Sequence, residues 1–177
     1  GVDAGATGNQ IIEKDLNLIL TRKLEKELVS RGATVYLTRE DDKDLSTTTV
    51  NRKRSDLYNR AKYINKISPN MYISIHLNSV TNSSWRGLQV FYTTKSEENK
   101  LIAETITNHL RKNMSNVREI KKDNTYYMYK HITSPGVLIE AGFISNSNDS
   151  YLLRNKEYQD KLISSISDSI EIYFQKK

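Results

Sequence analysis

Tyr72-Ile73-Ser74-Ile75-His76-Leu77-Asn78 is the stretch that decides the fold, because apolar and polar side chains alternate along it as they do along a β-strand. The strand ends in a histidine whose ring would lie at the rim of a sheet. Enzymes with α/β folds place their chemistry at that rim, on residues that follow the strands. The sequence therefore predicts an α/β protein with His76 in its functional site.

The segments before this strand alternate between helix and strand. From Glu13, apolar residues recur at the three-and-four spacing of one buried helix face, and Gly32 supplies a stop. Residues 33–39 hold adjacent apolar side chains and predict a strand. A second helical pattern ends at the breaker Ser68-Pro69. This alternation is typical of layered α/β domains.

The segments after the histidine strand continue the same order. Apolar and polar residues alternate over residues 88–92, which predicts a strand, and apolar residues recur at helical spacing over residues 102–114, which predicts a helix. The apolar run 136–141 predicts another strand, and the helical spacing over residues 163–174 predicts a last helix. The chain shows no internal repeat and no linker rich in Gly, Ser or Pro. We therefore expect a single α/β domain, with a mixed, largely parallel sheet flanked by helices.

The composition limits the class of protein. A length of 177 residues and 37% apolar content suit one domain with a substantial core. The net charge of +6 favours polyanionic surroundings without selecting among nucleic acid, anionic lipid and an acidic cell wall, and we interpret the basic run Arg52-Lys53-Arg54 as a solvated face. The chain has no cysteine, so a transition metal would need His, Asp or Glu ligands. No stretch approaches the roughly 20 apolar residues of a membrane span.

Three residues could together make a zinc hydrolase. Glu13 opens a helix after a glycine-bearing loop, His76 ends a strand, and Glu140 ends the apolar run 136–139. Zinc takes nitrogen and oxygen donors, and it lowers the pKa of a bound water to about 7. We predict that Glu13 and His76 are metal donors. Glu140 is the predicted proton acceptor, because apolar neighbours disfavour its charged form and raise its pKa.

Each of these residues also has a structural interpretation. A glutamate that opens a helix usually complements the helix dipole, and a lone histidine at a strand end is usually a hydrogen-bonded structural residue. A glutamate at a strand end is often an ion-pair partner. The joint occurrence of the three residues favours the functional interpretation. His109 and His131 lack a carboxylate at metal-like spacing, and we interpret both as nonligands.

Several segments, taken in order, match one known family. They are Val2–Ala6, Ile12–Asn17, Leu37–Arg39, Ser74–Asn78, Arg86–Tyr92 and Leu138–Asn146. In these segments the chain resembles the zinc-dependent N-acetylmuramoyl-L-alanine amidases of the amidase-3 family, and the match runs nearly end to end. Within the family, His76-Leu77-Asn78, Trp85 and Gln89–Tyr92 look most like the spore-cortex amidases.

The resemblance implies an activity and its setting. It implies that Glu13 and His76 bind Zn²⁺, that Glu140 is the catalytic acid/base, and that the substrate is the amide between N-acetylmuramic acid and L-alanine in peptidoglycan. It implies action outside the cytoplasm during sporulation and germination, in the spore-cortex maturation that leads to muramic-δ-lactam. The implied partners are peptidoglycan and an activator protein of the kind that regulates some relatives, with no nucleic acid.

The resemblance also implies residues upstream of Gly1. The family has a further zinc-binding histidine in a Gly-His-Gly-Gly loop, and alignment of Gly1 with the last glycine puts that histidine before Gly1. We therefore expect residues 1–177 to be an amidase catalytic domain that lacks its first strand and its first zinc-ligand histidine. Two alternatives stay open: a catalytically inactive, peptidoglycan-binding module with the amidase fold, and a nucleic-acid binder, which only the charge favours.

Overall fold

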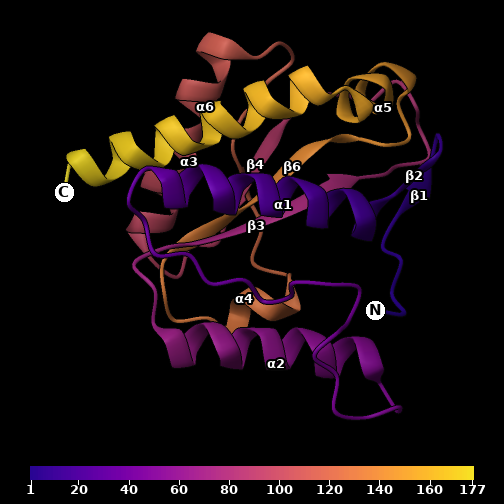
Figure 1. Ribbon diagram of the computed structural model, residues 1–177, viewed down its shortest axis with the longest axis vertical. Coiled ribbons are helices and arrows are strands. Elements are labelled where there is room, and N and C mark those ends of the chain that lie inside the picture. Colours follow the sequence, from indigo (N-terminus) through magenta and orange to yellow (C-terminus); the bar gives the residue numbers. More distant parts are fainter.

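Strand β3 (Tyr72–Asn78) is the predicted histidine strand, and it lies at one edge of a four-stranded sheet with the order β3-β6-β4-β5. Strand β6 (Gly136–Phe143) runs parallel to β3 and antiparallel to β4 (Gln89–Tyr92). Strand β5 (Lys121–Lys122) runs parallel to β4. The computed structural model describes residues 1–177 and confirms the expected mixed α/β domain (Figure 1).

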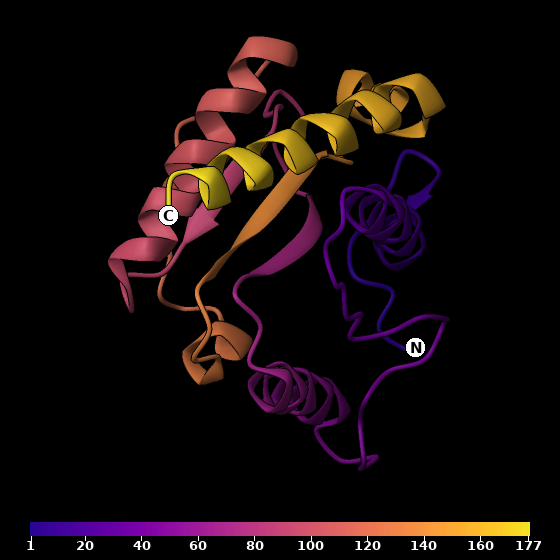
Figure 2. The same ribbon diagram turned by 60° about the vertical axis from the view of Figure 1, so that its left-hand side comes forward.

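Helices cover both faces of this sheet (Figure 2). Helices α1 (Glu13–Ser30), α3 (Glu97–Asn113) and α6 (Lys156–Gln175) pack on one face, around a cluster of 23 buried apolar residues. Helices α2 (Arg52–Ile67) and α4 (Tyr127–His131) pack on the other face, around a cluster of only 8. The two cores are therefore unequal in size.

The side-chain pattern of each strand follows its place in the sheet. Every residue of β6 is buried, because the strand lies inside the sheet with helices on both faces, and such strands read as continuous apolar runs. In β3, Ile75 and Leu77 enter the large cluster whereas Tyr72 enters the small one. Alternation along β3 thus separates the two cores and directs His76 to the face of the smaller one.

A short hairpin leads into α1. Strands β1 (Thr7–Gly8) and β2 (Ile11–Ile12) pair through a turn in which Asn9 and Gln10 have φ of +47° and +65°. Two central residues with positive φ are the hallmark of the tight hairpin turn whose twist suits the flanking strands. The Asn9 side-chain amide donates to the Ile144 carbonyl oxygen at 2.8 Å. This contact fixes the hairpin, and with it the start of α1, beside the end of β6.

The strand predicted at residues 33–39 is wrong. The segment runs as irregular chain, its Tyr36 side chain is 56% exposed, and β3 has β6 as its only partner in the sheet. A strand requires the backbone of a neighbour, which alternation within one segment does not encode. The helical spacing that starts at Glu13 includes Ile19, and that of residues 163–174 includes Phe174. The prediction that these two side chains are buried is wrong, because they are 48% and 41% exposed.

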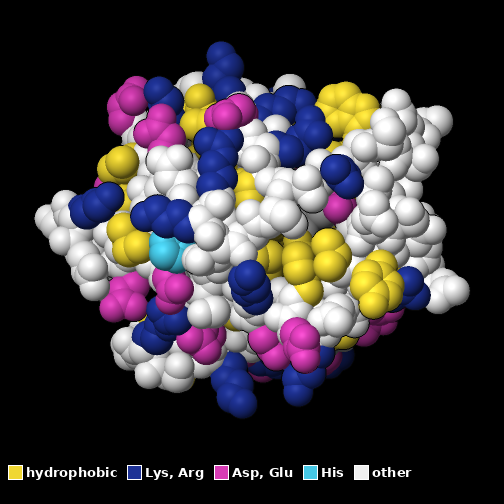
Figure 3. Space-filling view, turned by 90° about the horizontal axis from the view of Figure 1, so that it is seen from above, with side chains coloured by type: hydrophobic (Ala, Val, Ile, Leu, Met, Phe, Trp, Pro, Cys, Tyr) yellow, Lys and Arg dark blue, Asp and Glu magenta, His cyan; other side chains and the backbone are white.

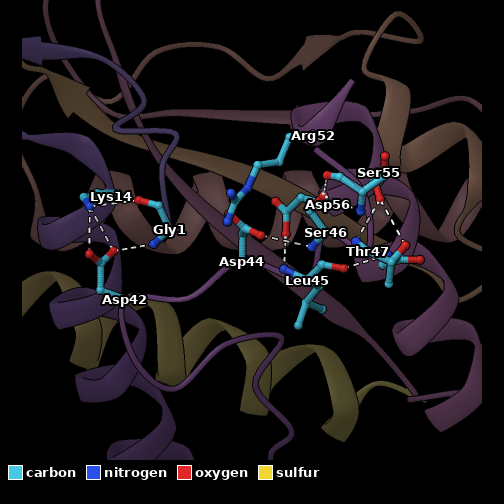
Figure 4. Close-up of polar contacts among 12 residues, drawn as sticks. Gly1, Lys14, Asp42, Asp44, Leu45, Ser46, Thr47, Arg52, Ser55 and Asp56 are labelled. Atoms are coloured by element: carbon cyan, nitrogen blue, oxygen red, sulfur yellow. Dashed lines mark hydrogen bonds and ion pairs between the residues drawn. The ribbon is translucent and has the colours of Figure 1, made fainter. Parts of the chain in front are cut away.

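Polar contacts connect the loop after this segment, residues 40–50, to two helices (Figure 4). Lys14 in the first turn of α1 pairs with Asp42 at 2.9 Å, and Arg52 at the start of α2 pairs with Asp44 at 2.9 Å. The loop therefore bridges the ends of α1 and α2 that lie toward the N-terminal loop.

The surface carries charges of both signs, and they are interspersed on the face seen in Figure 3. The basic run is exposed, as predicted. Within it, Arg52 pairs with Asp44, Lys53 pairs with Asp3, and Arg54 lies over the Tyr127 ring. None of the helices combines the length and the apolar composition that a membrane crossing requires.

Candidate metal and catalytic site

His76, Glu140 and Gln89 form a row across three adjacent strands. His76 of β3 is the direct register partner of Glu140 of β6, and Glu140 is the partner of Gln89 of β4. Directly opposed residues project from the same face of a sheet, at the spacing of neighbouring strands, about 4.8 Å. The structure therefore brings the predicted histidine and the second predicted glutamate side by side.

Glu13 reaches this row from the first turn of α1. Its Oε1 lies 2.9 Å from His76 Nδ1 and accepts a hydrogen bond from the Leu77 amide at 3.2 Å. Its Oε2 accepts from the Ala6 amide at 2.7 Å. Burial alone would raise the pKa of Glu13, but the hydrogen bonds from His76 and Ala6 outweigh burial and hold the pKa below its ordinary value. Glu13 is thus an ionised carboxylate in a fixed position.

Gly5 permits this close approach. It has φ of +67°, and a Cβ added there would lie 2.5 Å from Glu13 Oε2. Any other residue would combine an unfavourable backbone conformation with a clash against the carboxylate. The glycine-bearing loop seen in the sequence therefore serves to let the backbone of residues 4–6 pack against Glu13.

Glu140 is the most desolvated of the three predicted site residues. It is 7% exposed, and its Oε2 is buried without a hydrogen-bond partner. Burial raises the pKa of Glu140 from its ordinary 4.5 to about 7, while the charge of His76 acts against this rise and that of Glu13 adds to it. A carboxyl group with such a pKa can both take up and release a proton near neutral pH.

The residues present fit a zinc ion. His76 offers an imidazole nitrogen, and Glu13 offers an ionised oxygen in contact with it, which are donor types that Zn²⁺ accepts. The unpartnered oxygen of Glu140 belongs to the same face of the sheet. Among residues 1–177, no set of three or more His, Asp or Glu side chains is arranged to hold a metal ion.

The other two histidines lie among different partners. His109 Nε2 lies 3.2 Å from the Asn113 side-chain nitrogen and 3.4 Å from an oxygen of Asp168. The His131 ring packs edge-on against Tyr58 and Tyr127, with centroids 5.7 and 4.8 Å apart. That neither histidine is a metal ligand stays a prediction.

Tyr126, the N-cap residue of α4, lies beside the site. Its ring packs edge-on against Phe91 and Tyr129, with centroids 6.3 and 5.5 Å apart. Burial raises the pKa of Tyr126 to about 12, with the charge of Glu140 as the next contribution. The hydroxyl therefore stays protonated at neutral pH. The charge of Glu13 also contributes to this rise.

Sequence reasoning missed Asp149, which organises the loops at this end of the sheet. Asp149 is 6% exposed, and its Oδ2 accepts hydrogen bonds from the amides of Gly87 and Phe143 at 2.7 and 2.9 Å. It lies in helix α5 (Ser147–Arg154), whose N-cap Asn146 accepts from the Asp149 amide. The only sequence signal was an asparagine before a short helical pattern, which marks a cap but not a tertiary contact.

Comparisons with known proteins agree with this geometry. The family Amidase_3, described as N-acetylmuramoyl-L-alanine amidase, matches residues 1–172. The germination-specific N-acetylmuramoyl-L-alanine amidase of Bacillus subtilis (strain 168) is 41% identical over 182 residues, which cover 100% of this chain and 77% of that protein.

Solved structures show the same fold. The CwlD amidase from Clostridioides difficile, in complex with the GerS lipoprotein, superposes with a TM-score of 0.94 at 35% identity, over 100% of this chain and 94% of that one. The catalytic domain of CwlV from Bacillus (Paenibacillus) polymyxa var. colistinus superposes with a TM-score of 0.86 at 28% identity, over the same shares. The predicted resemblance, including that to the spore-cortex amidase CwlD, is confirmed. The chain therefore belongs to the N-acetylmuramoyl-L-alanine amidase family.

Proposed function

We propose that this protein is a zinc-dependent amidase that cleaves the bond between N-acetylmuramic acid and L-alanine in peptidoglycan. The observation that carries the proposal is the buried Glu140 carboxyl, which has an unpartnered oxygen and a pKa of about 7 and lies next to the Glu13–His76 pair. A buried acid with such a pKa is costly for the fold and suits proton transfer.

In this proposal Glu13 and His76 would hold Zn²⁺, together with the histidine that the family resemblance implies. When bound, the ion polarises the carbonyl oxygen and lowers the pKa of a water. The amides of Ala6 and Leu77 keep the Glu13 carboxylate oriented, because each oxygen of Glu13 accepts one of them. His76 is oriented in turn by its contact with Glu13 Oε1.

Glu140 moves the proton in this mechanism. Its unpartnered Oε2 accepts a proton from the attacking water, and the same oxygen returns the proton to the nitrogen of L-alanine as that amine leaves. The pKa of about 7 suits both steps, because neither protonation state is strongly preferred at neutral pH. No covalent link between the protein and the substrate is required.

The setting we propose is spore-cortex maturation outside the cytoplasm, at the step that precedes muramic-δ-lactam formation. The B. subtilis relative is named a germination-specific amidase, and the C. difficile CwlD structure was solved with a lipoprotein partner. These similarities support a comparable role for this chain, with an activator protein of the same general kind.

The test replaces Glu140 in the full-length protein. Glu140→Gln is expected to keep zinc and the fold but to lose roughly 100-fold or more in turnover, the usual scale for a general acid/base. The measurement is release of stem peptides with a free L-alanine amine from purified peptidoglycan, alongside zinc content. The matched control is Glu157→Gln, an exposed glutamate of α6.

Two outcomes would contradict the proposal. Retained turnover in Glu140→Gln would assign the proton transfer to another group. Binding of peptidoglycan without any release by the unmodified, zinc-loaded protein would favour the alternative of an inactive binding module.

A further inference from the structure

A second cluster of side chains lies next to Glu140 on the same face of the sheet. Asn78 of β3 is the register partner of Phe143 of β6. The pair lies two residues beyond His76 in β3 and three residues beyond Glu140 in β6, because the register shifts between the two pairs. Asn78 projects from the same face as His76, so Phe143 shares that face with Glu140. Phe143 belongs to neither of the two buried apolar clusters and packs against Trp85 instead.

Trp85 and Arg118 cover Phe143. The rings of Trp85 and Phe143 lie 6.4 Å apart and are tilted by 48°. The guanidinium carbon of Arg118 lies 4.5 Å from the Trp85 ring centroid and 5.7 Å from that of Phe143. Phe143 is 1% exposed whereas Trp85 is 48% exposed. The cluster therefore has a buried base and an open upper side formed by an indole and a cation.

Arg118 has no carboxylate partner. Its side chain makes one hydrogen bond, from Nη1 to the Arg86 carbonyl oxygen at 3.3 Å, and its buried Nε has no partner. Arg111 nearby, by contrast, pairs with Glu119 at 2.5 Å. A guanidinium that stacks on aromatic rings keeps its N–H edge available for a planar anion, and a carboxylate fits that edge with two parallel hydrogen bonds.

Hydrogen bonds within the protein hold the backbone around this cluster in place without a ligand. Asp149 ties Gly87 to Phe143 through one oxygen, and the Arg118 amide donates to the Leu88 carbonyl oxygen at 2.8 Å. Gly87 has φ of +99°, and a Cβ there would lie 2.1 Å from the Asn116 carbonyl oxygen. Such preorganisation reduces the entropy lost on binding.

The distance from Glu140 to this cluster suits a peptidoglycan stem peptide, so this inference rests on the proposed function. Neighbouring same-face positions of a strand lie roughly 6.6 Å apart, and an extended peptide spans about 3.3–3.6 Å per residue. A stem peptide whose scissile L-alanine amide lies at Glu140 can therefore bring the acidic group of its next residue to the cluster. That next residue, D-glutamate, carries a free α-carboxylate when it is not amidated.

We propose that Trp85 and Arg118 form a subsite that recognises the α-carboxylate of the second stem-peptide residue. Arg118 pairs with the carboxylate, and Trp85 holds the guanidinium flat and shields one side of the ion pair. The enzyme then prefers stem peptides with the free acid over amidated ones.

Trp85 is the single tryptophan of residues 1–177, and any tryptophan outside these residues is replaced by phenylalanine for the measurement, so the indole fluorescence reports on the subsite. The full-length, zinc-loaded Glu140→Gln protein is titrated with N-acetylmuramyl-L-alanyl-D-glutamate and with its amidated counterpart, N-acetylmuramyl-L-alanyl-D-isoglutamine. We expect the free acid to bind at least tenfold more tightly and to change Trp85 emission. In Arg118→Gln the preference should fall to about one, whereas Arg111→Gln, which removes a cation already paired with Glu119, should keep it.

The ligand comparison decides the question even if Arg118→Gln does not fold. Equal affinity of the two ligands for protein that retains Arg118 would overturn the proposal, as would a preference that survives in Arg118→Gln. An equal Trp85 response to a trimer of N-acetylglucosamine would assign the indole to sugar binding and would also overturn it. Hydrolysis is measured separately with Glu140 intact, so a failure of the amidase function leaves the binding comparison valid.

Discussion

Glu13 Oε1 lies 2.9 Å from His76 Nδ1, although the two residues are 63 positions apart in the sequence. The contact joins the first turn of α1 to the edge strand of the sheet. A carboxylate is also favoured at this end of a helix by the helix dipole, so the position stabilises the charge that a metal ligand needs. The structural and the functional interpretations of Glu13 are therefore compatible.

Replacement of this carboxylate tests the metal site. Glu13→Gln keeps the size of the side chain but removes the charge, so we expect zinc affinity to fall by roughly 100-fold or more. Competition with a chelator of known affinity measures the change. Asp15→Asn, an exposed acid in the same turn, is the matched control and should bind zinc normally. Unchanged zinc affinity in Glu13→Gln would exclude Glu13 as a ligand.

The raised pKa of Glu140 predicts a pH dependence of stability in zinc-free protein. A carboxyl whose folded-state pKa is raised stabilises the fold below its ordinary pKa of 4.5, and this contribution is lost as pH rises through about 7. The shift corresponds to about 3 kcal/mol in the free energy of unfolding. Glu140→Gln does not titrate, so its stability relative to the unmodified protein should increase between pH 5 and pH 9.

Urea unfolding in the presence of a chelator measures this difference. Glu157→Gln, in an exposed position, provides the control and should show no comparable change with pH. A constant difference between Glu140→Gln and the unmodified protein across that range would show that Glu140 is not desolvated as the structure indicates.

Gly87 should not tolerate a side chain. Gly87→Ala combines a φ of +99° with a Cβ 2.1 Å from the Asn116 carbonyl oxygen, and we expect a loss of about 3 kcal/mol or more. Gly32 has φ of +90° with no atom within 4 Å of the added Cβ, so Gly32→Ala should cost only about 1–2 kcal/mol. Equal losses in the two variants, measured by urea unfolding, would mean that the close approach at Gly87 is unimportant.

Removal of the Asp149 carboxylate leaves two buried amides without an acceptor. Asp149→Ala is therefore expected to lower the free energy of unfolding by roughly 2–4 kcal/mol and to shift Trp85 emission, because the amides of Gly87 and Phe143 lose their common partner. Asp160→Ala removes an exposed acid that pairs with Lys23 and should lower the free energy of unfolding far less. Loss of stability without any change in Trp85 emission would contradict the link between Asp149 and the aromatic cluster.

Long periodic segments could be predicted from the sequence, whereas features set by tertiary contacts could not. Helices α1, α3 and α6 and strands β3 and β6 lie where the apolar patterns predicted them, because each buries a continuous face or stripe. The segment 33–39 shows the limit: its apolar residues predicted a strand, but the segment has no neighbour with which to pair. Short elements such as β5, α4 and α5 carry too few residues for a period to appear.

The same distinction holds within the site. Sequence patterns selected Glu13 because it opens a helix, and His76 and Glu140 because each closes an apolar run. Strand β3 continues to Asn78 and β6 to Phe143, and the structure brings the three residues together. Their roles in metal binding and proton transfer remain proposals. Arg118 gave no signal, because the absence of an acidic partner is visible only when the neighbours in space are known.

The unequal sizes of the two apolar clusters predict which side of the sheet opens more readily by local unfolding. Local opening of α2 and α4 exposes only the smaller cluster of 8 residues, so amide hydrogens of these helices should exchange with solvent before those of α6. His76 and Glu140 project toward that thinner layer. The layer over His76 and Glu140 is therefore expected to open locally while α1, which carries Glu13, stays folded.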